Sequence, residues 1–341
     1  MTTPNAVVFG VSGTRLTADE RVFLRDADPF GFILFARNCT DAAGIRRLTA
    51  ELRDVVGRDD APILIDQEGG RVMRLRPPDW PFAPAARDIA GLYDQAPELA
   101  VAAAENLGRM FGAMLVDLGI DVDCAPVLDL GLPETTDAIG TRAYAADPEI
   151  VATLGGAMAR GLMREGCLPV IKHLPGHGRG AVDSHKELPR VDADLATLRG
   201  QDFAAFRALR QLPLGMSAHV VYSAIDPDRP GTVSPTVIET MIRGEIGFDG
   251  FLFTDDICMA ALDGSPADRA EAALSAGCDA VLHCSGVLSE MIEVSGAVGQ
   301  LSRSADSRWT RARARAARQK PEGADIGELA ETLAAQFENG I

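Results

Sequence analysis

Residues 168–189 read LPVIKHLPGHGRGAVDSHKELP, and this stretch carries the strongest signal for both the fold and the chemistry. Its apolar beginning predicts a buried strand that presents Lys172 and His173 at its carboxyl end. A long glycine-rich loop follows and ends in the triplet DSH (183–185). Because α/β barrels build their active sites from strand ends and the loops after them, this arrangement favours an enzyme over a passive binding module.

Seven further apolar runs of strand length occur along the chain, mostly separated by Ala- and Leu-rich stretches with charges at helical spacing. This alternation predicts parallel strands joined by right-handed helical crossovers, and eight such runs predict an α/β fold of the (β/α)8, or TIM-barrel, type. A doubly wound sheet is the alternative, although no G-x-G-x-x-G follows the first run. The further runs are residues 6–10, 31–36, 62–68, 120–130, 213–221, 250–256 and 279–284.

The chain is expected to form one catalytic barrel domain over residues 1–341, with residues 301–341 as a C-terminal helical extension. The first strands are expected to be irregular, because residues 11–30 leave little room for a full crossover helix. The arginines after residue 302 would suit a nucleic-acid-binding arm, but a solvated helix packed through Trp309 fits an acidic chain better.

The overall composition limits the partners of this chain. The net charge is −16, from 33 basic and 49 acidic residues, which disfavours nucleic acids and anionic membranes. The six cysteines include no CxxC pair, as is typical of reduced core residues. Neither a signal peptide nor an apolar run of about 18 residues is evident, so we expect a cytoplasmic protein.

Polar residues gather at the carboxyl ends of most of the apolar runs. In a barrel these ends share one mouth, so residues far apart in the sequence would meet there. Parallel strands buried on both faces ordinarily avoid charge, and the clustering therefore predicts a functional site. The residues concerned are Asp66, Glu68, Asp129, Lys172, His173, His219, Asp255, Asp256 and His283.

Two segments resemble the signature of glycoside hydrolase family 3: KHLPGHG followed after four residues by DSH and after two more by LP (172–189), and GFDGFLFTDDICM (247–259). Within that family the chain is similar to the single-domain bacterial β-N-acetylhexosaminidases of peptidoglycan recycling. The resemblance covers roughly residues 7–300 and implies a (β/α)8 barrel and a retaining double displacement. Further motifs in the family's order are ILFARN (33–38), IDQEGGRVMRL (65–75), CAPVLDL (124–130), IGTRAYAADP (139–148), MSAHVVY (216–222) and AGCDAVLHC (276–284).

The resemblance implies that Asp255, in FTDD, is the nucleophile that attacks the anomeric carbon. The alternative is a structural carboxylate that caps the following helix, a role that fits the neighbouring Asp256 better. The resemblance also implies that His185 is the acid–base and that Asp183 holds it. An imidazole can donate and then accept a proton near neutral pH, and a carboxylate stabilises its protonated form. An Asp/His turn on a solvated loop is the alternative for this pair.

The expected sugar-binding residues, again from the resemblance, are Asp66, Arg74, Arg142, Lys172 and His173. Carboxylates and bases suit a ring of hydroxyls because each accepts or donates hydrogen bonds in a fixed direction. Taken singly, Arg74 could form a surface ion pair and Arg142 could hold a loop.

A metal-dependent hydrolase is another interpretation of the same region, since barrel enzymes use His and Asp at strand ends as zinc ligands. No HxH follows the first strand, however, and Lys172 beside a cation would be unfavourable. We therefore expect neither a metal nor a cofactor. The residues that such a site would use are His173, His177, His185, Asp66 and Asp255.

The expected activity is removal of terminal β-linked N-acetylglucosamine (GlcNAc) from peptidoglycan fragments, GlcNAc-1,6-anhydro-N-acetylmuramic acid with or without peptide. The expected partner is thus a small amino-sugar or muropeptide substrate, bound by a monomer without nucleic acid or membrane. Phosphorolysis on the same site is one alternative, because a His acid–base would not repel an incoming phosphate dianion. A catalytically silent amino-sugar sensor is the other.

Overall fold

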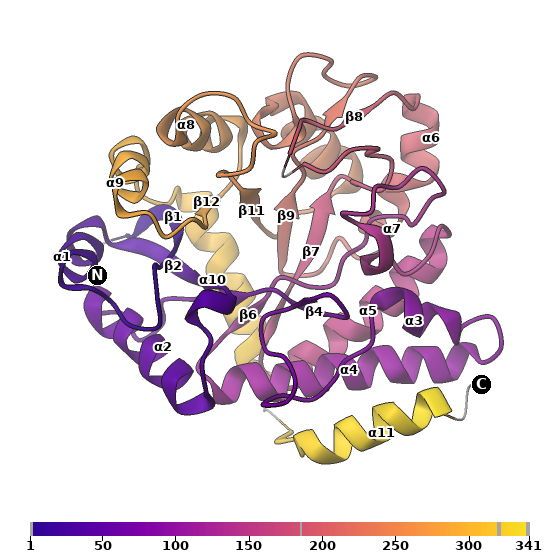
Figure 1. Ribbon diagram of the computed structural model, residues 1–341. Coiled ribbons are helices and arrows are strands. Elements are labelled where there is room, and N and C mark those ends of the chain that lie inside the picture. Colours follow the sequence, from indigo (N-terminus) through magenta and orange to yellow (C-terminus); the bar gives the residue numbers. More distant parts are fainter. Residues whose placement is uncertain (1–2, 185, 319–321, 339–341) are drawn as a thin grey trace.

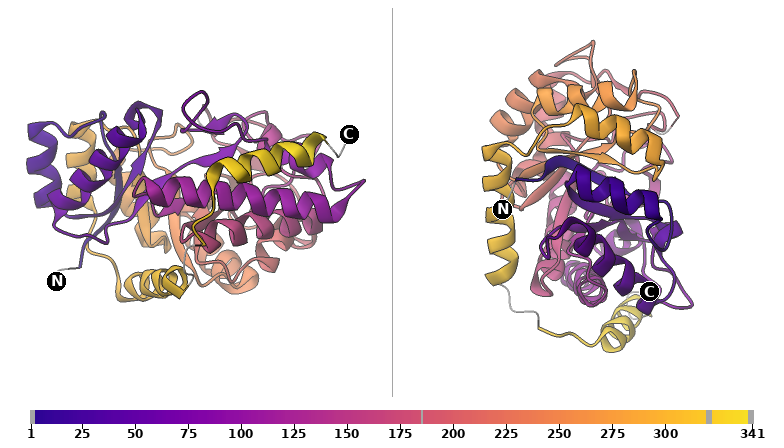
Figure 2. Two further views of the ribbon diagram at one scale, coloured as in Figure 1. Left: turned by 90° about the horizontal axis from the view of Figure 1, so that it is seen from below. Right: turned by 90° about the vertical axis from the view of Figure 1, so that its left-hand side faces the viewer.

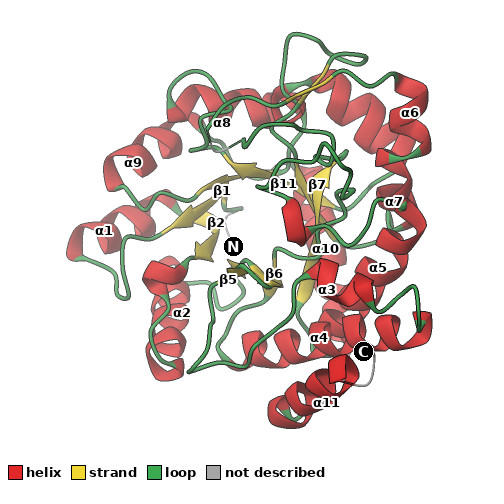
Figure 3. Cartoon of the chain, turned by 45° about the vertical axis from the view of Figure 1, so that its right-hand side comes forward, coloured by secondary structure: helices red, strands yellow, loops and turns green. Residues whose placement is uncertain are grey.

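A computed structural model describes residues 3–184, 186–318 and 322–338 of the chain. Eight parallel strands pair in chain order and close into a barrel, and helices surround it (Figures 1 and 3). The predicted (β/α)8 barrel is therefore confirmed. The barrel strands are β1 (Asn5–Gly10), β2 (Pro29–Leu34), β3 (Ile63–Ile65), β6 (Val122–Asp123), β7 (Leu168–Leu174), β9 (Leu214–Ser217), β11 (Phe251–Asp256) and β12 (Ala280–His283).

The crossover helices are α1 (Ala18–Ala27), α2 (Ala42–Val56), α3 (Ala86–Gly91), α4 (Pro97–Asp117), α5 (Pro148–Arg164), α6 (Leu195–Gly200), α7 (Asp202–Ala208), the π-helical η4 (Thr236–Ile246), α8 (Pro266–Ala276) and α9 (Leu288–Ala297). Five of the described helices between the strands (α1, α2, α5, α6 and α8) begin after a residue whose side chain accepts an amide of the first turn. Thr17 and Ser265 form capping boxes with Glu20 and Asp268. Shorter 3-10 turns are η1 (Ala36–Asn38), η2 (Gly140–Arg142) and η3 (Gly231–Val233).

The expected irregularity of the first strands is small. A register shift between Asn5 and Val8 interrupts the pairing of β1 with β2, yet α1 fits between the two strands. The larger departure is at the run 120–130, of which only the two residues of β6 are a strand. Pro126 explains the interruption, because it has no amide hydrogen for the ladder, and pairing resumes in a bridge between Val127 and Lys172.

The amino-terminal end of the barrel is closed by α10 (Arg303–Arg318). Trp309 packs edge-on against Phe30, with ring centroids 4.9 Å apart, and Phe30 stacks on Phe251 at 5.0 Å. Ala305 and Ala312 of the same helix are buried with them. This apolar cluster continues upward through the barrel interior, where Val8, Leu64, Val122, Val170, Phe253 and Leu282 are buried.

The basic side chains of α10 face acidic partners on the barrel. Arg308 pairs with Asp279 at 2.8 Å, and Arg311 pairs with Asp249 at 2.8 Å. The helix is thus the packed helix expected from Trp309, and these arginines are engaged within the chain. After the gap at residues 319–321, α11 (Ile326–Glu338) lies along α4 (Figure 2).

Within the part of the chain that the structure describes, α4 alone has the length and apolarity of a membrane-spanning helix. More than half of its apolar window is buried against neighbouring elements, as in the core helix of a folded domain. It crosses α5 so closely that a Cβ at Gly161 would lie 2.2 Å from the carbonyl oxygen of Glu105. Burial in the barrel wall therefore accounts for the apolar character of α4.

The opposite, carboxyl end of the barrel carries the long loops. A hairpin of β4 (Gln67–Gly69) and β5 (Val72–Met73) follows β3 directly, and Gln67 anchors it by bonding the backbone of Leu75. A second small sheet pairs β8 (Arg190–Val191) with β10 (Val221–Tyr222). These additions surround the mouth in which the predicted site residues lie.

Candidate active site

A cavity of about 260 Å³ opens at the carboxyl end of the barrel. Its wall includes every predicted site residue that the structure describes, drawn from four separate segments of the chain. His185 lies outside the described residues, so its position is not part of this geometry. The predicted residues that line the cavity are Asp66, Arg74, Arg142, Lys172, His173, Asp183 and Asp255.

One side of the cavity is a network of alternating charges. Lys172 Nζ lies 2.8 Å from Asp66 Oδ1 and 2.7 Å from Glu68 Oε1. Arg74 Nη2 reaches the other oxygen of Asp66 at 2.9 Å. Arg142 donates to both oxygens of Glu68, at 2.7 and 2.8 Å. The two arginines are therefore parts of this network, and neither is a surface ion pair or a mere loop support.

The network keeps its members charged although they are buried. Burial raises the pKa of Asp66, but Lys172 and Arg74 outweigh it and hold that pKa well below the usual range. Burial likewise raises the pKa of Glu68, and Arg142 and Lys172 overcome it. The pKa of Lys172 lies above its ordinary value, because the attraction of Asp66 and Glu68 exceeds the cost of burial. The cavity therefore offers fixed ionic acceptors and donors.

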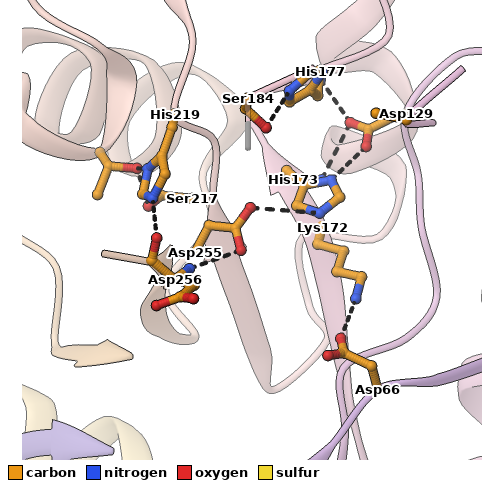
Figure 4. A network of polar contacts seen from close by, with 12 residues as sticks. Asp66, Asp129, Lys172, His173, His177, Ser184, Ser217, His219, Asp255 and Asp256 are labelled. Carbon is orange, nitrogen blue, oxygen red and sulfur yellow. Dashed lines mark hydrogen bonds and ion pairs between the residues drawn. The ribbon is translucent and has the colours of Figure 1, made fainter. Parts of the chain in front are cut away.

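On the other side of the cavity, His173 and Asp255 line the wall and the buried Asp129 lies behind His173 (Figure 4). Nδ1 of His173 donates to Asp129 Oδ2 at 2.6 Å, and Nε2 lies 3.9 Å from Asp255 Oδ2. Asp129 is fully buried, and its pKa falls to about 2 because the histidines His173 and His177 outweigh the effect of burial. The imidazole of His173 is thereby held in one orientation toward Asp255.

Asp255 and Asp256 end β11 but differ in surroundings. The Asp255 carboxylate stays in the cavity with its side chain 20% exposed, and its pKa is lowered because His173 and His219 outweigh burial. Asp256 Oδ1 instead accepts the amides of Cys258 at 2.9 Å and Cys284 at 3.2 Å. Asp256 therefore has a structural role, but it holds the turn after β11 and does not cap the following helix, whose N-cap is Ser265.

The loop after β7 is tied down at several points. Asp129 Oδ1 accepts the amide of His177 at 2.6 Å, and His177 Nε2 lies 3.3 Å from Ser184 Oγ. A Cβ at Gly178 would come within 2.4 Å of the carbonyl oxygen of Leu130, so only glycine fits there. His177 thus shapes this loop through its amide and its ring, and the loop brings Asp183 to the cavity wall.

The two remaining histidines, which were given no role, lie behind the cavity. His219 Nδ1 is 2.8 Å from Thr232 Oγ1 and its Nε2 is 3.0 Å from the carbonyl oxygen of Asp256. Burial lowers the pKa of His219, and its ring supports β11 through the carbonyl oxygen of Asp256. His283 is buried at the end of β12.

Glu68 and Asp129 are the two carboxylates that the sequence-based site omitted. Both were recognised as strand-end polar residues, but nothing local to either one shows its partner. Glu68 meets Arg142 across 74 positions of sequence and Asp129 meets His173 across 44. Their carboxylate type and strand-end position are the only signals that could have found them.

The comparisons with known proteins agree with this geometry. The description "Glycosyl hydrolase family 3 N terminal domain" matches residues 6–318, so the chain belongs to glycosyl hydrolase family 3. A "Beta-hexosaminidase" of Alkalilimnicola ehrlichii is 41% identical over 282 residues, which are 82% of this chain and 80% of that protein. The family and the glycoside hydrolase class predicted from the motifs are confirmed.

Solved structures show the same fold. NagZ from Neisseria gonorrhoeae in complex with N-trifluoroacetyl-D-glucosamine is 31% identical, covers 98% of both chains and superposes with a TM-score of 0.86. The same protein has also been solved with a zinc ion. A family 3 β-N-acetylglucosaminidase from Paenibacillus is 29% identical with a TM-score of 0.84, and covers 97% of this chain and 67% of that one.

Proposed function

We propose that this chain is a retaining exo-β-N-acetylglucosaminidase that removes terminal β-linked GlcNAc from peptidoglycan fragments. The main support is that an ionised carboxylate, Asp255, lies in one cavity with the Asp66–Lys172 network and with Asp183. The β-hexosaminidase names of the relatives support the amino-sugar substrate, as does the glucosamine derivative bound to the Neisseria protein. We further propose that the substrates are cytoplasmic muropeptides and that the chain acts as a monomer.

In the first step an Asp255 oxygen attacks C1 of the sugar, while His185 gives its proton to the leaving oxygen. The C1–O bond to the aglycone breaks and a glycosyl ester on Asp255 forms. In the second step His185 takes a proton from water, the water oxygen bonds to C1, and the ester bond breaks. Asp183 would hold the imidazole in position and stabilise its protonated form.

The ionic side of the cavity is suited to the sugar hydroxyls. Asp66 keeps lone pairs for hydroxyl donors although it pairs with Lys172 and Arg74, because each carboxylate oxygen accepts more than one hydrogen bond. Lys172 has a third proton available besides those given to Asp66 and Glu68. These groups are rigid before substrate arrives, so little entropy is lost when a sugar binds.

The low pKa of Asp255 suits a nucleophile. A carboxylate that attacks carbon must be ionised in the free enzyme, and the histidines nearby keep it so. The attraction of His173 is directed at Oδ2 from 3.9 Å, which leaves Oδ1 held by the amide of Asp256 at 2.8 Å. Either oxygen is thus oriented before the sugar enters.

The decisive experiment measures nitrophenol release from an aryl β-N-acetylglucosaminide, followed by product analysis with GlcNAc-anhydro-muropeptide. Turnover that resists EDTA, with β-GlcNAc as first product and a glycosylated Asp255 peptide, supports the proposal. GlcNAc-1-phosphate formed only with phosphate would replace hydrolysis by phosphorolysis. Binding of GlcNAc without turnover would indicate a sensor, and activity lost to EDTA would indicate a metal enzyme.

A further inference from the structure

A second cluster of chemically active side chains lies beside the cavity, where β11, β12 and α9 meet (Figure 1). Cys258 follows β11, His283 ends β12 and Glu290 is in the first turn of α9. None of the three lines the cavity of the proposed active site. Their ligand atoms all lie within 4.8 Å of one another, although the residues come from three separate segments.

His283 is the unusual member of this cluster. Its side chain is 0% exposed. Among the described residues, Nδ1 has no polar partner, and Nε2 has the 3.3 Å approach of Glu290 Oε2 without the geometry of a hydrogen bond. Phe9 meets the ring edge-on with centroids 5.9 Å apart, which fixes its plane. Burying a polar group that lacks hydrogen bonds is unfavourable, so the position of this imidazole is explained best by an ion that it binds.

The spacing of the cluster suits a small tetrahedral cation. His283 Nε2 lies 3.3 Å from Glu290 Oε2. Two ligands held tetrahedrally at the Zn–N and Zn–O lengths of about 2.0–2.1 Å are themselves about 3.3 Å apart. The thiol of Cys258 is within 4.8 Å of both atoms. A Zn–S bond of about 2.3 Å gives a tetrahedral edge of about 3.5 Å, so the thiol lies within about 1.3 Å of the third corner.

We propose that Cys258, His283 and Glu290 form a Zn²⁺ site, with water as the fourth ligand. Thiolate, imidazole and carboxylate are the ligand types that zinc takes in proteins, whereas Mg²⁺ and Ca²⁺ require oxygen ligands. The thiol must lose its proton to bind, so one proton is released to solvent when the Zn–S bond forms. The carboxylate and the thiolate together neutralise the charge of the ion.

This site is separate from the proposed catalytic chemistry but is coupled to it through the backbone. Cys258 donates its amide to Asp256 Oδ1, and Asp256 follows Asp255 in β11. Zinc would therefore connect the turn after the nucleophile to α9. The inference rests on binding and not on turnover, so it stands or falls independently of the proposed function.

The test uses the full chain, freed of metal, titrated with Co²⁺ and then with Zn²⁺. Cobalt bound to a thiolate gives a near-ultraviolet sulfur-to-metal charge-transfer band, and a tetrahedral site gives strong visible bands. We expect both bands to saturate at one cobalt per chain and to disappear when zinc displaces the cobalt. A bound cobalt without the sulfur band would overturn the proposal, because the side chains His173 and Asp255 at the other site contain no sulfur.

Substitutions of the three proposed ligands and of a control cysteine distinguish loss of a zinc ligand from a general effect of mutation on binding. Cys258→Ser should remove the charge-transfer band, and His283→Gln and Glu290→Gln should each weaken zinc binding in equilibrium dialysis by about a hundredfold or more. Cys39→Ser, at a half-buried cysteine elsewhere, is the matched control and should bind one zinc as the parent does. Glu290 is half-exposed and its amide variant should fold, which melting curves verify. Unchanged affinity in Glu290→Gln and His283→Gln would refute the site.

Discussion

The two ends of the barrel are built from the same strands but have opposite compositions. At the amino-terminal floor, Phe30, Phe251 and Trp309 pack against one another without a charge among them. At the carboxyl-terminal mouth, Glu68 and Lys172 are buried as ions, and the partly buried Asp66 pairs with Lys172. Apolar burial at the floor stabilises the fold. Removing charges from water at the mouth destabilises it, and the ion pairs there offset that cost.

The comparison teaches that stability and activity are separated along the barrel axis. Side chains at the floor are expected to affect the free energy of unfolding and to leave the chemistry intact. Those at the mouth are expected to affect turnover, and their removal costs stability only where it leaves a buried partner unpaired. Four predictions test this division.

The largest effect is expected at the mouth, for Asp255→Ala. Turnover of an aryl β-N-acetylglucosaminide should fall by roughly 10⁴-fold or more, because no glycosyl ester can form. The melting temperature should stay near that of the parent, since among the described residues the carboxylate accepts the amide of Asp256 and lies 3.9 Å from His173. GlcNAc binding measured by calorimetry should persist, and residual turnover within tenfold of the parent would remove Asp255 from the mechanism.

At the floor, Trp309→Ala should lower the free energy of unfolding by about 3–5 kcal/mol, as expected for loss of a large packed aromatic side chain. Urea unfolding followed by circular dichroism measures the change. The kcat/KM of Trp309→Ala, measured at a temperature where this variant is folded, should equal that of the parent. Trp309→Phe, which keeps a ring against Phe30, should lose less stability, and a large loss of kcat in either variant would break the division.

The proposed acid–base pair gives the next effect. Asp183→Ala and His185→Ala should each reduce kcat/KM by about a hundredfold, the usual contribution of general acid–base catalysis. The double variant should be little worse than either single one, because the two groups act as a unit. Substrates with good leaving groups should lose less, since they need less proton donation. Additive losses in the double variant would show that the two residues act separately.

The smallest effect concerns Asp129, whose pKa is lowered to about 2 in the folded chain. A depressed folded pKa contributes stability above the unfolded value of about 3.9, and this contribution is lost as the pH falls from about 4 to about 2. The free energy of unfolding of the parent should therefore drop more steeply over that interval than that of Asp129→Asn, by on the order of 2 kcal/mol in total. Equal pH slopes in the two proteins would contradict the pairing with His173.

Much of the fold could be predicted from the sequence, because strand and helix signals are local. Seven of the eight apolar runs contain barrel strands of three or more residues, and the eighth, at 120–130, contains the two-residue β6. At this run the sequence predicts a longer strand than the structure contains. An apolar run indicates burial but not strand pairing, and Pro126 has no amide hydrogen for the ladder. The assignment of residues 1–341 to one domain with a helical extension stays a prediction.

The candidate site was predicted less completely. The site residues predicted from strand-end polarity and the family motifs all line one cavity, as far as the structure describes them. Neither signal could pair Glu68 with Arg142, Asp129 with His173, or Cys258 with His283 and Glu290. Each of these contacts joins separate segments, and its geometry exists only once the strands have closed in register.

The sequence by itself determined the alternation of strands and helices, the family and the residues that reach the mouth, since each depends on local pattern and residue type. Only the tertiary structure decided which charges neutralise which, that Asp256 holds a turn while Asp255 faces the cavity, and that Trp309 closes the floor. The physical reason is that pairing energies depend on distance and burial, and both are set by the closure of the barrel.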